Sequence, residues 1–191
     1  GSIVTPHVDG TRSSTESLID LKRTTNMDVS NVSFDSTGQP TFDGTDDRID
    51  LGYAPITGTG DFTITSVYKT NTSAANTIIG NYPNGNLQFM GGYGLYIAGS
   101  CYFTSTPLPA GTYCATATRE NGVCKIYLNG QLQRTVNNSN DIGINSFRIG
   151  TNTSGTEPFN GEIYNIKLYG RALSADEVQQ NFNTYKNRFN I

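Results

Sequence analysis

The chain has 191 residues and a net charge of -3, and charged residues make up only 15% of it. It contains no cluster of Lys and Arg, which argues against nucleic-acid binding, and no apolar run of the roughly 18 residues that cross a bilayer, which argues against membrane insertion. Abundant Thr and Tyr, together with 21 Gly, are typical of short β-strands joined by tight turns.

Short runs of alternating apolar and polar residues recur from Val32 onward, separated by turn residues. This spacing predicts an all-β jelly roll, which is a sandwich of two antiparallel sheets with about a dozen strands. Residues 1–30 are polar and weakly patterned, so we expect an irregular lead-in there. The sequence shows no linker, repeat or charge block, and we therefore predict a single domain over residues 1–191.

Several aspartates lie close together in a predicted hairpin at residues 41–51. Asp43, Asp46 and Asp47 can supply some of the about six or more oxygen ligands that Ca²⁺ requires. The same aspartates are also typical turn residues, because their side chains bond to nearby backbone N–H groups. Both interpretations stay open. No pattern in the sequence requires a cofactor, and Ca²⁺ is the candidate that this hairpin suggests.

A stretch rich in tyrosine, asparagine and glycine follows at residues 81–103. A carbohydrate site needs a flat aromatic ring for the apolar face of a sugar and short polar side chains for its hydroxyls. Tyr82, which stands beside a Pro-Asn-Gly turn, is the best single candidate, whereas the later tyrosines can equally serve as strand residues. The predicted glycan-binding residues are Asn81, Tyr82, Asn84, Tyr93 and Tyr96.

Turn residues predict a three-stranded meander in the middle of the chain. Residues 113–119 and 123–128 flank one Asn-Gly pair, and a second Asn-Gly pair follows them. Asn-Gly supplies the positive φ values of tight hairpin turns. We predict a register in which Thr118 pairs with Val123. That register places one set of residues on the core face: Tyr113, Ala115, Ala117, Cys124, Ile126 and Leu128.

The chain has three cysteines, Cys101, Cys114 and Cys124, and no CxxC spacing that would suggest zinc or redox chemistry. The predicted register directs Cys114 and Cys124 to opposite faces of the sheet. We therefore expect no disulfide between them, and we interpret the cysteines as small, partly buried apolar residues.

One helix is predicted at residues 174–187. Ser174 and Glu177 have the spacing of a capping box, in which each side chain bonds to the backbone N–H of the other residue. Apolar residues then recur at helical spacing and form one stripe, which favours packing of the helix against the sandwich. The stripe consists of Val178, Phe182, Tyr185 and Phe189.

The sequence lacks the residue patterns of the common hydrolases. A retaining glycosidase needs two carboxyl groups about 5 Å apart, usually from a strand with paired glutamates, but the glutamates of this chain are scattered. The chain has a single histidine, His7, so a His-based triad or a zinc site is not expected. We predict that the domain is not an enzyme.

Four segments resemble, in order, the laminin-G-like branch of the concanavalin A-like lectin/glucanase superfamily. They are residues 41–51 (TFDGTDDRIDL), 111–122, 123–130 (VCKIYLNG) and 159–178. Two positions depart from the family pattern: Tyr113 stands where the family usually has Trp, and Arg48 where it usually has an aromatic residue. The chain has no Trp at all, so a sugar-stacking Trp is absent.

The resemblance implies a concanavalin A-like jelly roll with a short C-terminal helix. The low-charge, Asn/Thr/Gly-rich texture is similar to that of domains in bacteriophage virion proteins, including tail fibres, appendages and capsid decorations. A non-catalytic module on a virion surface or outside a cell is therefore expected, with glycans and neighbouring virion subunits as partners. The alternatives are a purely structural assembly domain without a ligand and a secreted bacterial adhesin of lectin type.

Overall fold

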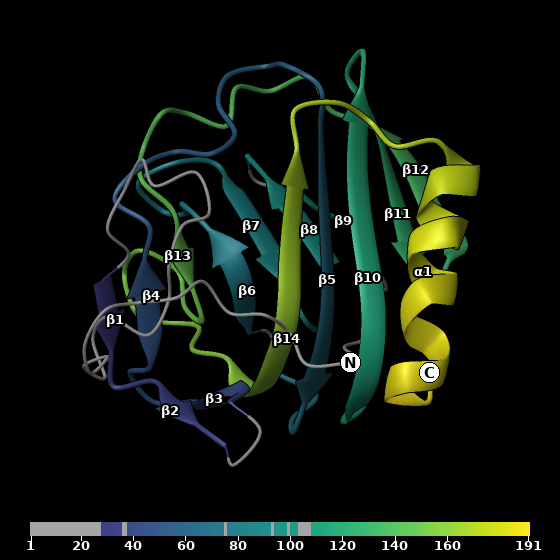
Figure 1. The fold of residues 1–191 in the computed structure, drawn as a ribbon. Helices are drawn as coiled ribbons and strands as arrows, with labels where there is room; N and C mark the ends of the chain where they lie inside the picture. Colours follow the sequence, from purple (N-terminus) through teal and green to yellow (C-terminus); the bar gives the residue numbers. More distant parts are fainter. Residues whose placement is uncertain (1–27, 36–37, 75, 93, 99, 103–107) are drawn as a thin grey trace, which may run out of the picture.

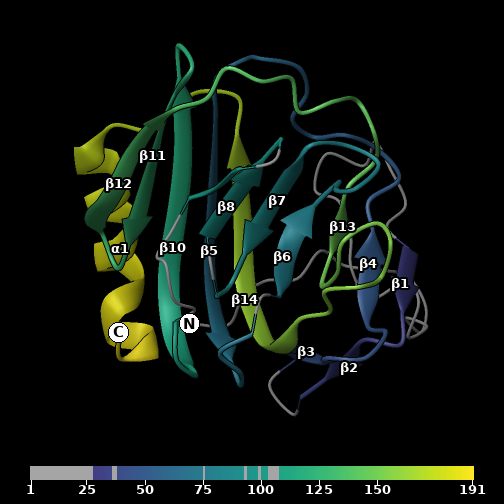
Figure 2. The same ribbon diagram turned by 180° about the vertical axis from the view of Figure 1, so that it is seen from behind.

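The computed structural model describes residues 28–191 apart from 36–37, 75, 93, 99 and 103–107. In this part of the chain, two antiparallel sheets pack face to face and one helix lies outside them (Figure 1; Figure 2). The predicted all-β sandwich with a C-terminal helix is confirmed. No helix in the described residues has the length and apolar character needed to cross a membrane.

Each sheet has seven strands among the described residues. In spatial order, the first sheet contains β1 (Asp28–Ser30), β4 (Arg48–Asp50), β13 (Arg148–Ile149), β6 (Thr77–Gly80), β7 (Leu87–Met90), β8 (Gly94–Ile97) and β9 (Ser100–Tyr102). The second contains β12 (Gln131–Asn137), β11 (Val123–Leu128), β10 (Gly111–Glu120), β5 (Phe62–Thr70), β14 (Asn160–Tyr169), β3 (Pro40–Asp43) and β2 (Ser33–Phe34).

The expected irregular lead-in is wrong for its last three residues. Residues 28–30 form β1, which pairs with β4 so that Val29 lies opposite Ile49, and both side chains belong to the core. Val29 is a single apolar residue between polar neighbours, so the sequence shows no alternating pattern that would predict a strand here. This short edge strand forms because it pairs with β4. Residues 1–27 lie outside the described part of the chain.

The hydrophobic core fills the space between the sheets. It consists of the alternate residues of each strand that point inward. Leu87 and Phe89 from β7, with Leu95 and Ile97 from β8, are fully buried in this core. Since successive strand residues point to opposite faces, the residues between them, including Tyr96, lie on the outer face of the first sheet. Because of this alternation, the side chain of Tyr96, which belongs to the candidate site, lies on the outside of the sandwich.

The β10–β11 hairpin differs from the predicted register by two residues. Glu120 pairs with Val123, because Asn121 (φ 49°) and Gly122 (φ 76°) form the turn by themselves and β10 continues to Glu120. A shift of two residues preserves the side-chain alternation. The predicted core face is therefore right although the pairing is wrong, and Cys124 still points into the core.

Cys114 and Cys124 are buried free thiols, and Cys124 lies in the core between the sheets. Burial raises the pKa of both, for Cys114 to about 11. These thiols are therefore protonated at neutral pH and behave as small apolar residues. The side chain of Cys101 lies outside the described part of the structure.

Helix α1 (Ala175–Phe189) begins with the predicted capping box. Glu177 N donates to Ser174 Oγ over 3.3 Å, and Ser174 N donates to the Glu177 carboxylate over 2.8 Å. Leu173 and Val178 pack with Tyr127 of β11 in a small second core. The helix thus covers part of the outer face of the second sheet, beside β10 and β11 (Figure 1; Figure 2).

Candidate functional site

The structure brings two of the predicted glycan-binding tyrosines together. Tyr82 follows β6, and Tyr96 lies in β8 on the outer face of the first sheet. Their ring centroids are 4.7 Å apart with an interplanar angle of 65°. Both side chains are partly exposed, and the neighbouring Asn84 is exposed. The pair therefore offers an aromatic surface flanked by a short polar side chain.

Asn81 was predicted to contact a ligand, but in the structure its side chain lies inside the protein and fixes the loop that carries Tyr82. Its side chain is fully buried and its amide is used inside the protein. Asn81 Nδ2 donates to the carbonyl of Ile142 over 2.9 Å, and Asn81 Oδ1 accepts from Leu87 N over 2.9 Å. A buried amide satisfied by two segments fixes their relative position rather than facing solvent.

Thr153 also fixes the loop that carries Tyr82, through three hydrogen bonds. Its Oγ1 and its backbone N both donate to the carbonyl of Tyr82, over 2.8 and 2.7 Å, and Oγ1 accepts from Asn84 N over 3.3 Å. Arg148 in turn donates to the Thr153 carbonyl over 2.9 Å and to Asp50 over 2.5 Å. A chain of hydrogen bonds therefore connects the first sheet with the loop that carries Tyr82.

Sequence reasoning did not identify Thr153 as part of the site. Its surroundings, Asn-Thr-Ser-Gly-Thr, indicate a loop, but the loop packs on residues 71 positions away. No local pattern specifies that pairing. Tyr93, also a predicted ligand residue, lies outside the described residues.

Part of the outer face of the first sheet is covered by residues 152–157. Gln88 pairs with Tyr96 in the β7–β8 register and is only 2% exposed. Gln88 Nε2 donates to Thr77 Oγ1 over 2.5 Å and to the Glu157 carboxylate, which also accepts from Asn152 over 3.3 Å. This polar network covers Gln88. The tyrosine pair beside the network stays partly exposed and forms the accessible aromatic surface on this face.

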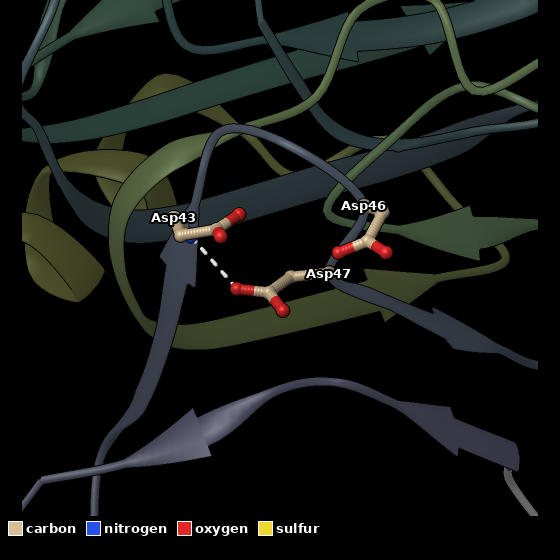
Figure 3. Close-up of side chains that lie close together, drawn as sticks. All are labelled: Asp43, Asp46 and Asp47. Atoms are coloured by element: carbon tan, nitrogen blue, oxygen red, sulfur yellow. Dashed lines mark hydrogen bonds between the residues drawn. The ribbon is translucent and has the colours of Figure 1, made fainter.

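The second candidate is the turn between β3 and β4, where Asp43, Asp46 and Asp47 lie together. One carboxylate oxygen of each lies within 4.8 Å of the others. Figure 3 shows the three side chains gathered at the turn, with Asp43 N donating to Asp47 Oδ2 over 2.7 Å. Thr45 N donates to Asp43 Oδ1 over 2.7 Å, and Asn31 Nδ2 donates to Asp46 Oδ2 over 2.8 Å.

These contacts support both earlier interpretations of the turn. Two of the carboxylates accept backbone N–H groups, as turn aspartates do. Burial raises the pKa of Asp47, which is 5% exposed; the N–H of Asp43 opposes this effect, and the charges of Asp43 and Asp46 add to it. The hydrogen bonds leave one oxygen of each carboxylate without a donor among the described residues. A hard cation prefers such oxygens, so this donor set fits part of a Ca²⁺ coordination shell.

The fold of the described residues is similar to that of several solved proteins. Domain 4 of AbnA, an extracellular arabinanase from Geobacillus stearothermophilus solved in complex with arabinotriose, has a TM-score of 0.62 at 20% identity, over 80% of each chain. Trypanosoma rangeli sialidase has a TM-score of 0.59 at 18% identity, over 82% of this chain and 29% of the sialidase. Botulinum neurotoxin type C has a TM-score of 0.60 at 14% identity, over 85% of this chain and 47% of the toxin structure.

The chain spans less than half of the sialidase and toxin structures, and at these identities the likeness concerns the fold. Comparison with curated protein sequences finds no significant match. The sequence does match the family model for the concanavalin A-like lectin/glucanases superfamily, Laminin_G_3, over residues 43–179. This match covers well over half of the chain, so the protein belongs to the concanavalin A-like lectin/glucanase superfamily.

Proposed function

We propose that this protein is a non-catalytic carbohydrate-binding domain and that its ligand lies against Tyr82 and Tyr96. The observation that carries the proposal is the partly exposed ring pair, whose centroids are 4.7 Å apart. Tyr96 lies on strand β8, and Tyr82 lies on a loop that hydrogen bonds fix. A rigid aromatic surface binds the apolar face of a sugar at low entropic cost. Asn84 supplies an amide for hydroxyl groups beside it.

The similar structures support this assignment. Domain 4 of the arabinanase was solved with arabinotriose, and cell entry of botulinum neurotoxin type C depends on two ganglioside molecules. Carbohydrate binding thus recurs among proteins with this fold. We extend it to the present chain as a proposal, because a shared fold does not by itself imply a shared function.

The surroundings of the glutamates support a non-catalytic role. Glu157 bonds to Gln88, Glu162 bonds to Lys69 and Tyr164, and Glu177 caps helix α1. These carboxylates belong to different elements and have structural partners. A retaining glycosidase needs two carboxyl groups about 5 Å apart that face the scissile bond. The carboxylates of Asp43, Asp46 and Asp47 lie within 4.8 Å of one another, but two of them accept backbone N–H groups of their own turn.

We further propose that the domain is displayed on a bacteriophage virion or outside a cell, as the resemblance to virion modules implies. Glycans on a cell surface or in the environment are then its ligands, and neighbouring virion subunits its other partners. A purely structural assembly role is the alternative. It predicts no glycan binding, so one binding experiment separates the two.

The test is a glycan array followed by titration calorimetry with the best ligand, with Tyr82→Ala as the variant. We expect Tyr82→Ala to weaken binding by about tenfold or more, since an aromatic anchor contributes that much at a binding site. Tyr185→Ala, which alters a ring on α1 outside the site, is the control and leaves affinity unchanged. Equal affinity of the wild type and Tyr82→Ala contradicts the proposed site, and an array without any hit favours the assembly role.

We also propose that Asp43, Asp46 and Asp47 hold Ca²⁺ when it is present, without being required for folding. Thermal melting of the wild type with millimolar Ca²⁺ and with EDTA tests this. A binding site raises the melting temperature in Ca²⁺, and Asp46→Asn abolishes the rise. If the wild type melts identically in both buffers, the aspartates serve the turn alone.

A further inference from the structure

The chain between β12 and β13 presents an apolar side chain to solvent. This β12–β13 connection, residues 138–147, crosses from the second sheet to the first at the upper end of the sandwich (Figure 2). Ile144 lies in it and is 82% exposed, whereas the other exposed large apolar residues described, Leu132 and Tyr53, are 53% and 37% exposed. Single exposed apolar residues are common on proteins, so it is the position of Ile144 that suggests a function.

Asn81 fixes the β12–β13 connection to the start of the loop that carries Tyr82, residues 81–86, which we call the tyrosine loop. Asn81 Nδ2 donates to the carbonyl of Ile142 over 2.9 Å and to the carbonyl of Asn145 over 3.5 Å. Ile144 therefore lies between two residues whose carbonyls contact the same buried amide. Because Tyr82 directly follows Asn81, this amide brings the backbone at Ile144 to the start of the tyrosine loop.

The end of the tyrosine loop contacts the same connection. Asn86 N donates to the carbonyl of Ile142 over 3.2 Å, and Asn86 Nδ2 donates to the carbonyl of Asp141 over 2.9 Å. Gly143 lies against Gly85, since a Cβ atom on Gly143 would be 3.5 Å from Gly85 Cα. The β12–β13 connection therefore lies beside both ends of the tyrosine loop.

Hydrogen bonds on either side of Ile144 hold the connection in place. Arg119 donates to the carbonyl of Asn140 over 2.9 Å, and Phe147 N donates to the carbonyl of Tyr53 over 3.1 Å. Isoleucine is β-branched, so its χ1 angle is already restricted before a ligand binds. A contact with Ile144 therefore costs little backbone or side-chain entropy.

The chemistry of Ile144 differs from that of the polar residues around it. Asn84 and Asn145 are exposed, and their amides can bond to the hydroxyl groups of a sugar. An aliphatic side chain makes no hydrogen bonds, so it stabilises only a ligand group that is itself apolar. On a sugar, a group of this kind is a methyl group, which belongs either to a 6-deoxy sugar or to the acetyl group of an acetamido sugar.

We propose that Ile144 is a further ligand contact of the site formed by Tyr82 and Tyr96, and that it selects sugars that carry a methyl group. This inference rests on the proposed function and adds the class of ligand. A methyl group that becomes buried against Ile144 strengthens binding by about fourfold. The same sugar without the methyl group gains nothing from Ile144.

The experiment titrates two pairs of sugars into the wild type, Ile144→Ser and the control Leu132→Ser, and follows the methyl resonances by NMR. L-fucose is compared with L-galactose, and N-acetylglucosamine with glucose, so that each pair isolates one source of the methyl group. Leu132→Ser removes the other well exposed aliphatic side chain, which lies on β12 in the second sheet. The best ligand of the glycan array is titrated into Tyr82→Ala, which tests the proposed function separately.

We expect the wild type and Leu132→Ser to bind the methyl-bearing member of one pair about fourfold more tightly than its partner, with a nuclear Overhauser effect between the ligand methyl group and the Ile144 methyl groups. Ile144→Ser binds both members equally and keeps the melting temperature of the wild type, because the side chain is exposed.

Three results overturn the role of Ile144: neither pair binds, the wild type shows no preference within either pair, or Ile144→Ser keeps the preference. If Ile144→Ser weakens both members of a pair alike, selection for a methyl group is also wrong. In each of these cases the proposed function stands when Tyr82→Ala weakens binding of the array ligand. A glycan array without any hit overturns both proposals.

Discussion

Arg119 is a buried charge that joins two loops at one end of the sandwich. It is 0% exposed, and its guanidinium lies 4.9 Å from the ring centroid of Phe62. Three of its nitrogens donate over 2.9 Å each to the backbone carbonyls of Gly60, Asn140 and Gly58. These carbonyls belong to the segment before β5 and to the segment after β12, so one side chain connects regions that are distant in sequence.

We expect Arg119→Met to lower the free energy of unfolding by about 3 kcal/mol. Hydrogen bonds to a charged group contribute about 1.5–3 kcal/mol each, and three are lost. Removing the guanidinium also removes the cost of burying its charge, which is roughly several kcal/mol. This gain offsets part of the loss. Burial lowers the pKa of Arg119, and this has the same physical origin as the penalty.

The assay is urea unfolding followed by circular dichroism, with the free energy extrapolated to water. Arg134→Met is the matched control, because Arg134 is exposed on β12, and we expect its effect to stay within about 0.5 kcal/mol. Arg119→Lys keeps the charge but loses the planar fork, so it destabilises at least as much as Arg119→Met. A loss below about 1 kcal/mol for Arg119→Met would refute the reasoning, because it would mean that water replaces the guanidinium without cost.

Three further predictions concern other parts of the fold. Asn81→Leu removes the amide between two loops and lowers the free energy of unfolding by about 2 kcal/mol or more, whereas the exposed Asn84→Leu changes it little; equal losses in urea unfolding would contradict this role. The pKa of Glu177 is lowered to about 2, first by the side chain of Arg171 and then by the N-cap backbone, so the wild type loses this stabilisation as the pH falls from 4.5 toward about 2. Glu177→Gln flattens that part of the curve of melting temperature against pH, and an unchanged curve would exclude the effect. Burial raises the pKa of Asp47 above 3.8, so folding favours the protonated carboxyl group over the ionised one. The stability that the protonated group contributes is therefore lost as the pH rises above 3.8. Asp47→Asn therefore raises the melting temperature at pH 7 in EDTA, and a lowered one would show that the charge is needed.

Local chemistry was sufficient to predict the turns and the helix start. Asn121 and Gly122 adopt positive φ angles, and Ser174 and Glu177 form the capping box, because these features depend on residues at most a few positions apart. The hairpin pairing was predicted two residues off, since the pattern alone did not show whether Glu120 belonged to the strand or to the turn.

The candidate site was predictable only in part. Tyr82 and Tyr96 come together as a partly exposed pair, but Asn81, from the same polar stretch, is buried and joins two loops. An asparagine has the same local signature in either role. What distinguishes the roles is the approach of residues 142–145, which lie about 60 positions away in sequence.

By itself, the sequence determined the layered β architecture, the faces of the strands and the positions of the tight turns, because alternation and backbone dihedral preferences act over a few residues. Only the tertiary structure decided that Arg119 joins the segment before β5 to the segment after β12, and that Thr153 fixes the loop that carries Tyr82. Those contacts join segments 21 to 71 positions apart. They form only when the sheets pack, so no short-range pattern encodes them.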